Sequence, residues 1–186
     1  MLLRAMRAFL KDGFEAASYE KIAKKMGLSK PSLYNTFGDK LSLFQHVLDG
    51  YAIQARAYII GNFSNQNSLE EAAQNLLRSA ATFYSQPEGP SLGCLLIGTA
   101  LPASTQYDSV RETLSSFTLS LDKLLEEIID TQYAHGAQAR GQSPRLLALQ
   151  ISSLVFTLAV RARMGLSRKQ LLVCADELAE VVGKKS

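Results

Sequence analysis

The sequence of 186 residues is poor in the residues that build disulfide-stapled, metal-binding or hydrolytic proteins. Its two cysteines, Cys94 and Cys174, are too few for a disulfide framework and do not have metal-ligand spacing. Its two histidines, His46 and His135, fall on different predicted helices. The chain also shows no nucleophile elbow, no phosphate-binding glycine loop and no paired carboxylates. These absences predict a protein that is not an enzyme and that has neither a metal site nor a cofactor.

Long hydrophobic runs are also missing from the sequence. The longest apolar stretches, such as Leu154–Val160, are much shorter than the about 20 residues that a membrane-spanning helix needs. Arg4, Arg7 and Lys11 interrupt the apolar residues at the beginning, which is unlike a secretory signal segment. Apolar residues still make up 47% of the chain, enough for a sizeable core. The sequence therefore predicts a cytoplasmic protein with no membrane partner.

Cys94 leaves two interpretations open. It follows Gly93 and precedes the apolar run LLIGTAL, which is typical of a small core residue. A helix start at this point would favour the thiolate form, so a redox-sensing thiol remains the alternative.

The positive charge is confined to the beginning of the chain. Residues 1–50 contain eight Lys or Arg and five Asp or Glu, whereas residues 51–186 contain twelve of each. The net charge of +3 therefore belongs to the first 50 residues. Phosphate contacts supply the sequence-independent part of DNA affinity, so this excess favours a nucleic-acid-binding segment. The alternative is that Lys21, Lys24 and Lys25 only solvate a helix face.

Residues 18–43, SYEKIAKKMGLSKPSLYNTFGDKLSL, have the pattern of a helix-turn-helix. Ile22 and Ala23 face inward on a first short helical pattern, and Leu33 and Phe37 face inward on a second. A glycine turn lies between the two patterns. This arrangement presents the second helix to DNA.

The residues at the ends of these helices have the chemistry that helix ends require. Ser18 and Ser29 can each cap a helix, because a hydroxyl oxygen accepts from the free amides of the first turn. Gly27 allows the positive φ with which a chain leaves a helix. Pro31 lies in the first turn of the second helix, where a missing N–H costs little.

The combination IAxxxGLSxxxLYxxFxxKxxL resembles the DNA-binding end of TetR-family transcriptional regulators. The residues that match are Ile22, Ala23, Gly27, Leu28, Ser29, Leu33, Tyr34, Phe37, Lys40 and Leu43. The resemblance covers about the first 50 residues, and only the general helical plan matches beyond them. It implies a ligand-responsive regulator, most often a repressor, that binds a double-stranded DNA operator.

The exposed face of the second helix is the predicted reading surface, made of Ser29, Lys30, Pro31, Ser32, Tyr34, Asn35 and Thr36. The candidates for base contacts are Lys30, Ser32, Asn35 and Thr36. Asn can pair with adenine, Lys can donate to guanine, and a Thr methyl group can touch a thymine methyl group. Phosphate contacts are predicted for Ser18, Tyr19, Tyr34 and Lys40. For each of these residues the alternative is an exposed helix position without a DNA contact.

Helical spacing continues through the rest of the chain and predicts an all-α protein with about nine helices. They are expected at residues 1–12, as two short helices within 18–38, and at 39–60, 68–85, 92–101, 107–134, 143–164 and 167–182. Residues 136–141 are expected to form a polar loop, and the sixth helix to stop before Pro102. The predicted domains are a helix-turn-helix DNA-binding domain, residues 1–45, and an effector-binding and dimerisation domain, residues 46–186.

The last two helices predict a homodimer. Apolar residues occupy more than one face of the helix at 143–164, so this helix must be covered on most sides. The resemblance implies that the last two helices pair with those of a second chain, although a central core helix has the same pattern. Two recognition helices related by two-fold symmetry can read successive major grooves about 34–36 Å apart.

The resemblance further implies an effector pocket among the fifth to eighth helices. The candidate lining residues are Phe83, Tyr84, Leu96, Ile97, Thr99, Phe117, Leu121 and Phe156. Most are apolar, which fits a small apolar or aromatic effector. Residues of this kind at helical spacing are also typical of an ordinary core. Two other classes of function remain open, namely a helical protein–protein adaptor and a small-molecule carrier without a role in DNA binding.

Overall fold

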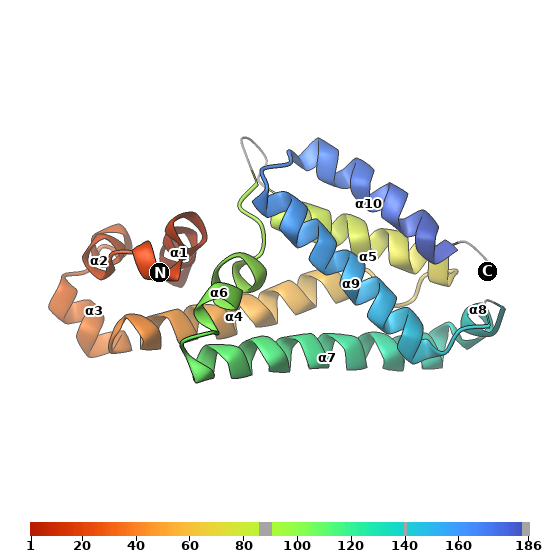
Figure 1. Ribbon diagram of the computed structural model, residues 1–186, viewed down its shortest axis with the longest axis horizontal. Helices are drawn as coiled ribbons and strands as arrows, with labels where there is room; N and C mark the ends of the chain where they lie inside the picture. Colours follow the sequence, from red (N-terminus) through yellow and green to blue (C-terminus); the bar gives the residue numbers. More distant parts are fainter. Residues whose placement is uncertain (86–90, 140, 184–186) are drawn as a thin grey trace. The chain divides into compact units, whose positions relative to one another are not determined.

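The computed structural model describes residues 1–85, 91–139 and 141–183, and it confirms the all-α class. These residues contain ten α-helices, one short π-helix and no strand (Figure 1). The elements are α1 (Leu2–Ala16), α2 (Tyr19–Met26), α3 (Lys30–Phe37), α4 (Lys40–Ile60), α5 (Leu69–Tyr84), the π-helix η1 (Leu96–Ala100), α6 (Leu101–Ala103), α7 (Asp108–Gln132), α8 (Ala134–Ala139), α9 (Pro144–Arg163) and α10 (Arg168–Gly183).

The chain divides into two compact units. The first unit comprises Met1–Gln54 and Cys94–Ser115, and the second comprises Ala55–Gly93 and Ser116–Ser186. The long helices α4 and α7 each begin in the first unit and end in the second. The expected division after residue 45 concerns where DNA and effector bind, and it remains a prediction.

Aromatic side chains form the centre of the first unit. The ring of Phe44 in α4 lies 4.8 Å from the rings of both Phe9 and Phe14, measured between centroids. Gly13 has φ 75° and interrupts α1 between these two phenylalanines. The interruption turns the chain so that Phe14 also enters the core, and it gives α2 and α3 a rigid base.

The second unit is built on α5, which packs against α10 and α9 (Figure 1). The side of α9 that faces this core carries the buried residues Leu147, Ala148, Ile151, Ser152, Val155, Leu158, Ala159 and Ala162. Among the described residues, α9 is also the one helix long and apolar enough to cross a membrane. The uninterrupted apolar runs of the sequence are short, so they did not indicate a helix that could cross a membrane. Because one face of α9 is buried against α5 and α10, its apolar residues are explained by packing in the core.

Two local predictions were wrong. The sixth helix does not stop before Pro102, because η1 runs into α6 with the proline in the first turn, where its missing N–H is not needed. The predicted loop at 136–141 is instead helical over Ala134–Ala139, and residue 140 lies outside the described part. Burial of Ala137 and of the preceding Tyr133 stabilises α8 despite Gly136, a contribution that local sequence does not reveal.

Candidate nucleic-acid interface

The turn between α2 and α3 is held by the backbone geometry that its glycine permits. The hydroxyl of Ser18 accepts from the Lys21 amide at 3.3 Å and caps the beginning of α2. Gly27 ends the helix with φ 77°, and the Leu28 amide donates to the Ala23 carbonyl at 3.0 Å. Because Ala23 is small and buried, α3 can pack closely against α2.

Helix α3 presents the predicted reading surface to solvent. Leu33 is buried and anchors the helix, and Ser29 caps it by accepting from the Ser32 amide at 3.2 Å. All seven residues of the predicted surface are exposed: Ser29, Lys30, Pro31, Ser32, Tyr34, Asn35 and Thr36. The structure therefore brings them together on one short helix beside the basic end of α2.

Hydroxyl groups on one side of α3 are already hydrogen-bonded within the protein. The hydroxyls of Ser29 and Ser32 lie 2.8 Å apart, and the Thr36 hydroxyl donates to the Ser32 carbonyl at 2.8 Å. Within the described residues, no such bond holds the side chains of Lys30 and Asn35. These two side chains can reach toward a base edge without first breaking an internal contact.

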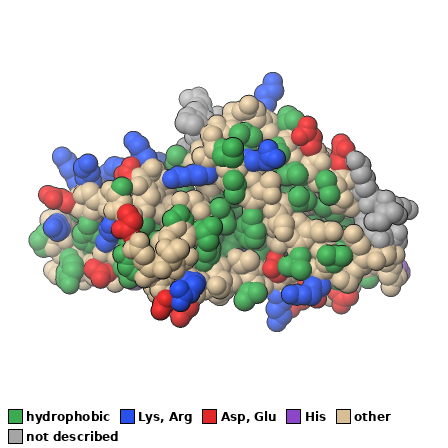
Figure 2. Space-filling view, in the orientation of Figure 1, with side chains coloured by type: hydrophobic (Ala, Val, Ile, Leu, Met, Phe, Trp, Pro, Cys, Tyr) green, Lys and Arg blue, Asp and Glu red, His purple; other side chains and the backbone are tan. Residues whose placement is uncertain are grey.

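Two grooves flank α3. The first, of about 530 Å³, is lined by Tyr19, Lys30, Pro31, Tyr34, Asn35, Asp39 and Lys40. The second, of about 510 Å³, is lined by Ser18, Glu20, Lys21, Ala23, Lys24, Leu28, Ser29 and Lys30. Figure 2 shows Lys and Arg side chains gathered around α2. Lys30, the first residue of α3, borders both grooves: the first groove runs along α3, and the second lies at α2 and the turn that leads into α3.

Two of the predicted phosphate contacts, Tyr19 and Lys40, have internal partners that fix their positions. The Tyr19 hydroxyl donates to the Gly38 carbonyl. Burial raises the pKa of Tyr19, and the neighbouring Asp39 carboxylate adds to this effect. The Lys40 ammonium donates to the Glu15 carbonyl at 3.1 Å and lies 4.6 Å from the centre of the Phe14 ring. Both side chains are half-buried and keep one edge toward the first groove.

Asp39 has a structural role at the first groove. Its carboxylate accepts from the Ser42 amide at 2.8 Å, at the beginning of α4. Hydrogen bonds from Ser42 lower the pKa of Asp39, so the carboxylate is ionised at neutral pH and caps the helix.

Sequence reasoning missed two residues beside this surface. The Arg4 guanidinium of α1 donates to the Lys25 carbonyl at 3.0 Å, at the end of α2 where a cation complements the helix dipole. Glu20 lines the second groove among lysines. Only the excess of positive charge in this segment could have pointed to Arg4, since its contact joins positions 21 residues apart, and that excess gave no signal for Glu20.

The predicted effector residues do not lie in one compact unit. Leu96, Ile97 and Thr99 belong to the first unit, whereas Phe83, Tyr84, Phe117, Leu121 and Phe156 belong to the second. The Thr99 hydroxyl, expected to bind an effector, donates to the Phe9 carbonyl at 3.2 Å and is buried. The predicted effector pocket remains a prediction.

The cysteines and histidines occupy ordinary structural positions. Cys94 is buried and Cys174 is half-buried. His46 approaches the Ser42 carbonyl at 2.8 Å and packs edge-on against Phe37, while His135 is exposed on α8. In the described part of the chain, no three His, Cys, Asp or Glu residues are grouped as metal ligands are.

Residues 2–47 match the family model of bacterial regulatory proteins, tetR family. The HTH-type transcriptional repressor ComR of Escherichia coli (strain K12) is 26% identical over 178 residues, which is 92% of this chain and 82% of ComR. A TetR family transcriptional regulator, CifR, was solved as a cysteine mutant with 26-bp double-strand operator DNA. It is 30% identical, with a TM-score of 0.77, over 96% of this chain and 93% of CifR.

A crystal structure of a regulator from Chloroflexus aurantiacus J-10-FL has a TM-score of 0.80 with 18% identity. That match covers 99% of this chain and 92% of the other, and it supports the fold.

Proposed function

Because the chain belongs to the TetR family of bacterial transcriptional regulators, a family of DNA-binding proteins and not of enzymes, we propose that it is a repressor. It binds a palindromic operator as a homodimer in the cytoplasm and is released by a small apolar or aromatic effector. The observation that carries this proposal is the exposed polar face of α3, whose first residue borders two lysine-bearing grooves.

We assign base contacts to Lys30, Ser32, Asn35 and Thr36. Asn35 and Lys30 have the free donors and acceptors that adenine and guanine edges require. The Thr36 hydroxyl donates to the Ser32 carbonyl, so the methyl group of Thr36 is the group available to contact a thymine methyl group. Phosphates of the two strands follow the flanking grooves, where Ser18, Tyr19, Tyr34 and Lys40 contact them.

The dimer forms through α9 and α10. Their outer faces leave large apolar side chains exposed: Leu146, Leu149, Val160, Met164, Val173 and Val181. Figure 2 shows hydrophobic side chains over these two helices. On α9 these residues recur at helical spacing opposite the buried core face, which supports a second covered face. A two-fold pair then sets the separation of the two α3 helices.

We keep the effector in this proposal because most of the candidate lining residues are apolar and several of them are buried. Phe117, Leu121 and Tyr84 are buried in the second unit, and Phe83 packs its ring 5.8 Å from that of Tyr84. Such a lining favours an apolar or aromatic ligand. Binding of the effector releases the operator only by stabilising a dimer in which the spacing of the two α3 helices no longer matches successive major grooves of the DNA.

Selection of bound duplexes from a random pool tests the DNA-binding part of the proposal. We expect enrichment of an inverted repeat whose half-sites lie about one helical turn apart. The matched control is Asn35→Ala, which should change the consensus at one position of each half-site. A pool that shows no enrichment, at a salt concentration where non-specific binding is weak, would contradict operator recognition.

The effector is tested separately on the selected duplex. A panel of small aromatic and aliphatic compounds is added to the preformed complex, and operator affinity is measured for each compound. Weaker binding with at least one compound supports the switch. If none changes the affinity, the effector-responsive part of the proposal fails, while the DNA-binding part stands.

A further inference from the structure

Two carboxylates line the grooves that flank α3. Asp39 lies in the first groove and is used as the cap of α4, since it accepts from the Ser42 amide. Glu20 lies in the second groove, which also exposes Lys21, Lys24 and Lys30. A negative charge at a surface that meets DNA phosphates is unfavourable unless it has a specific partner. Glu20 therefore needs an explanation that Asp39 does not.

In the part of the chain that the structure describes, the Glu20 carboxylate forms no ion pair with the neighbouring lysines. Lys24 follows it by four residues, which is the favourable order and spacing for an ion pair on a helix. In the described residues, however, Glu20 makes no ion pair and no side-chain hydrogen bond, and it is exposed. Its carboxylate therefore stands free in the groove beside Ser29 and Lys30, at the beginning of α3.

Cytosine is the base whose major-groove edge suits a free carboxylate best. A carboxylate only accepts hydrogen bonds, and the cytosine N4 amino group is the donor that Glu recognises in the major groove. Guanine presents the acceptors O6 and N7 there, and thymine presents O4, so both repel a carboxylate. The same charge that attracts cytosine therefore rejects guanine and thymine, and adenine is disfavoured because its N7 acceptor lies beside its amino group.

We propose that Glu20 is a specificity-determining residue of α2 that reads a cytosine next to the base pairs contacted by α3. This inference rests on the proposed operator binding and extends the reading surface from one helix to two. The competing explanation is that Glu20 only stabilises the beginning of α2, where a first-turn carboxylate complements the helix dipole.

The test compares wild-type protein, Glu20→Gln and Glu20→Ala by selection from a random pool, followed by affinity measurements on single-base variants of the consensus. Glu15→Gln is the matched control, because it removes the same charge from an exposed position in the same unit and lines neither groove. Circular dichroism confirms that each variant is folded. The salt dependence of binding is recorded for all four proteins.

We expect the wild-type consensus to contain one cytosine in each half-site whose replacement weakens binding roughly tenfold, near the lower end of a good base contact. Glu20→Gln should shift this position toward adenine, which an amide recognises, and Glu20→Ala should remove the preference. Both variants should bind unrelated DNA more tightly, and Glu15→Gln should leave the consensus unchanged.

Unchanged base preferences in folded Glu20→Gln and Glu20→Ala would overturn the inference and leave the dipole explanation. Failure of the wild-type protein to enrich any sequence would contradict the proposed function itself. The two failures are therefore distinguishable.

Discussion

At the residue scale, two of the proposed phosphate-contacting side chains are held by contacts within the protein before DNA binds. Lys40 is the clearest case, since its ammonium contacts the Glu15 carbonyl and the Phe14 ring. Tyr19 is similarly held by the Gly38 carbonyl. Such contacts reduce the rotamer freedom that would otherwise be lost on binding.

Replacing Lys40 with Ala should weaken binding to all DNA sequences by a similar factor. It should also reduce the magnitude of the slope of log affinity against log salt by about 1, because one phosphate contact is lost. Lys40→Arg keeps the charge and should keep the slope. Filter binding over a salt series provides the measurement, and an effect confined to one base position would argue against a phosphate role.

Gly93 is a residue whose importance only the tertiary structure reveals. It has φ +75°, and an added Cβ would lie 3.0 Å from the Arg163 amide nitrogen and 3.1 Å from the Ala159 carbonyl oxygen of α9. Gly93→Ala should therefore lower the free energy of unfolding by about 2 kcal/mol or more, from backbone strain and crowding against α9.

Gly50→Ala is the control, because this helical glycine has nothing within 4 Å of an added Cβ. It should raise the free energy of unfolding by up to about 1 kcal/mol through helix propensity. Denaturant titrations compare the two variants, and equal effects would show that the approach of Gly93 to α9 is unimportant.

At the element scale, several helices begin with a serine whose side chain caps the first turn. Ser167 and Gln170 form a reciprocal pair at the beginning of α10, with the Ser167 amide donating to the side-chain oxygen of Gln170 at 2.9 Å and the Gln170 amide donating to the Ser167 hydroxyl at 3.4 Å. At α5, the Ser68 hydroxyl accepts from the Glu71 amide, but the pair is not reciprocal, because the Glu71 carboxylate accepts from the Asn67 amide and not from the Ser68 amide. The caps set where helices begin, and contacts between helices decide how they pack.

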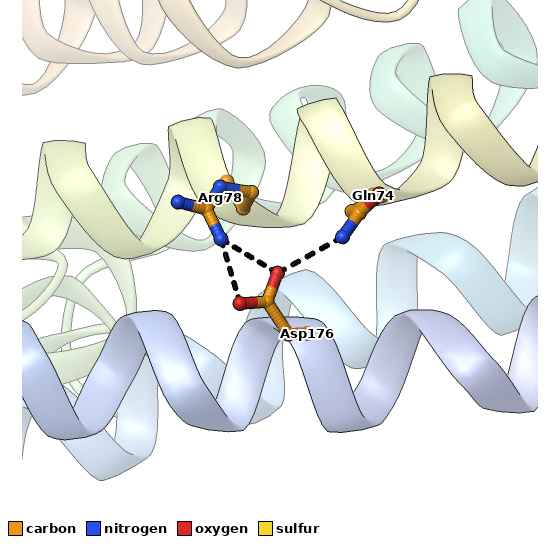
Figure 3. A network of polar contacts seen from close by, with 3 residues as sticks. All are labelled: Gln74, Arg78 and Asp176. Atoms are coloured by element: carbon orange, nitrogen blue, oxygen red, sulfur yellow. Dashed lines mark hydrogen bonds and ion pairs between the residues drawn. The ribbon is translucent and has the colours of Figure 1, made fainter.

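One polar contact between helices joins α5 to α10 (Figure 3). A guanidinium nitrogen of Arg78 lies 2.6 and 2.7 Å from the two Asp176 carboxylate oxygens, and Gln74 donates to the same carboxylate at 3.2 Å. The hydrogen bond from Arg78 lowers the pKa of Asp176, partial burial opposes this effect, and Gln74 adds to it.

The pair should make a small, pH-dependent contribution to stability. A lowered pKa in the folded state stabilises the protein above the ordinary carboxyl pKa, and this stabilisation is lost as pH falls through the lowered value. Because the two side chains remain 45% and 41% exposed, solvent screening limits the contribution to less than about 1 kcal/mol.

Arg78→Met should therefore destabilise the protein slightly at pH 7, and the difference should disappear at an acidic pH below the lowered pKa of Asp176. Arg111→Met is the control, since Arg111 pairs with Asp108 three residues away on the same helix and joins no two elements. Denaturant titrations at both pH values give the comparison. A difference that is independent of pH would assign the effect to packing of the Arg78 stem.

At the scale of the whole molecule, the proposed recognition of a palindromic operator requires two copies of α3 at a fixed separation. One short helix reads only a few base pairs, and linking two binding sites multiplies affinity through a high effective concentration. The exposed apolar residues of α9 and α10 therefore matter for DNA binding although they lie in the other compact unit.

The double variant Val160→Glu with Met164→Glu should be a folded monomer at micromolar concentration and should bind the operator about 100-fold more weakly or worse. Both residues are exposed in the single chain, so the folded state should survive the added charges. The control is Leu119→Glu, an equally drastic change at an exposed position of α7. Sedimentation gives the oligomeric state, and a wild-type monomer at micromolar concentration would refute the proposed dimer.

The helix-turn-helix could be predicted from sequence because its signals are local. The cap at Ser29, the glycine at Gly27 and the inward Leu33 act over one or two helical turns, and each has the expected geometry. The effector residues could not be placed in the same way. Their helical spacing fits a core and a pocket equally well, and Thr99 in fact binds the Phe9 carbonyl.

The sequence by itself determined the helical class, the turn that exposes α3 and the family, because short-range periodicity and helix-end chemistry specify them. Tertiary structure alone decided that Lys40 packs on Phe14, that α8 is helical and that Gly93 touches α9. It also decided that Glu20 stands free in a groove beside α3. These features join residues far apart in the chain, and their energies come from burial and close approach, which no local pattern encodes.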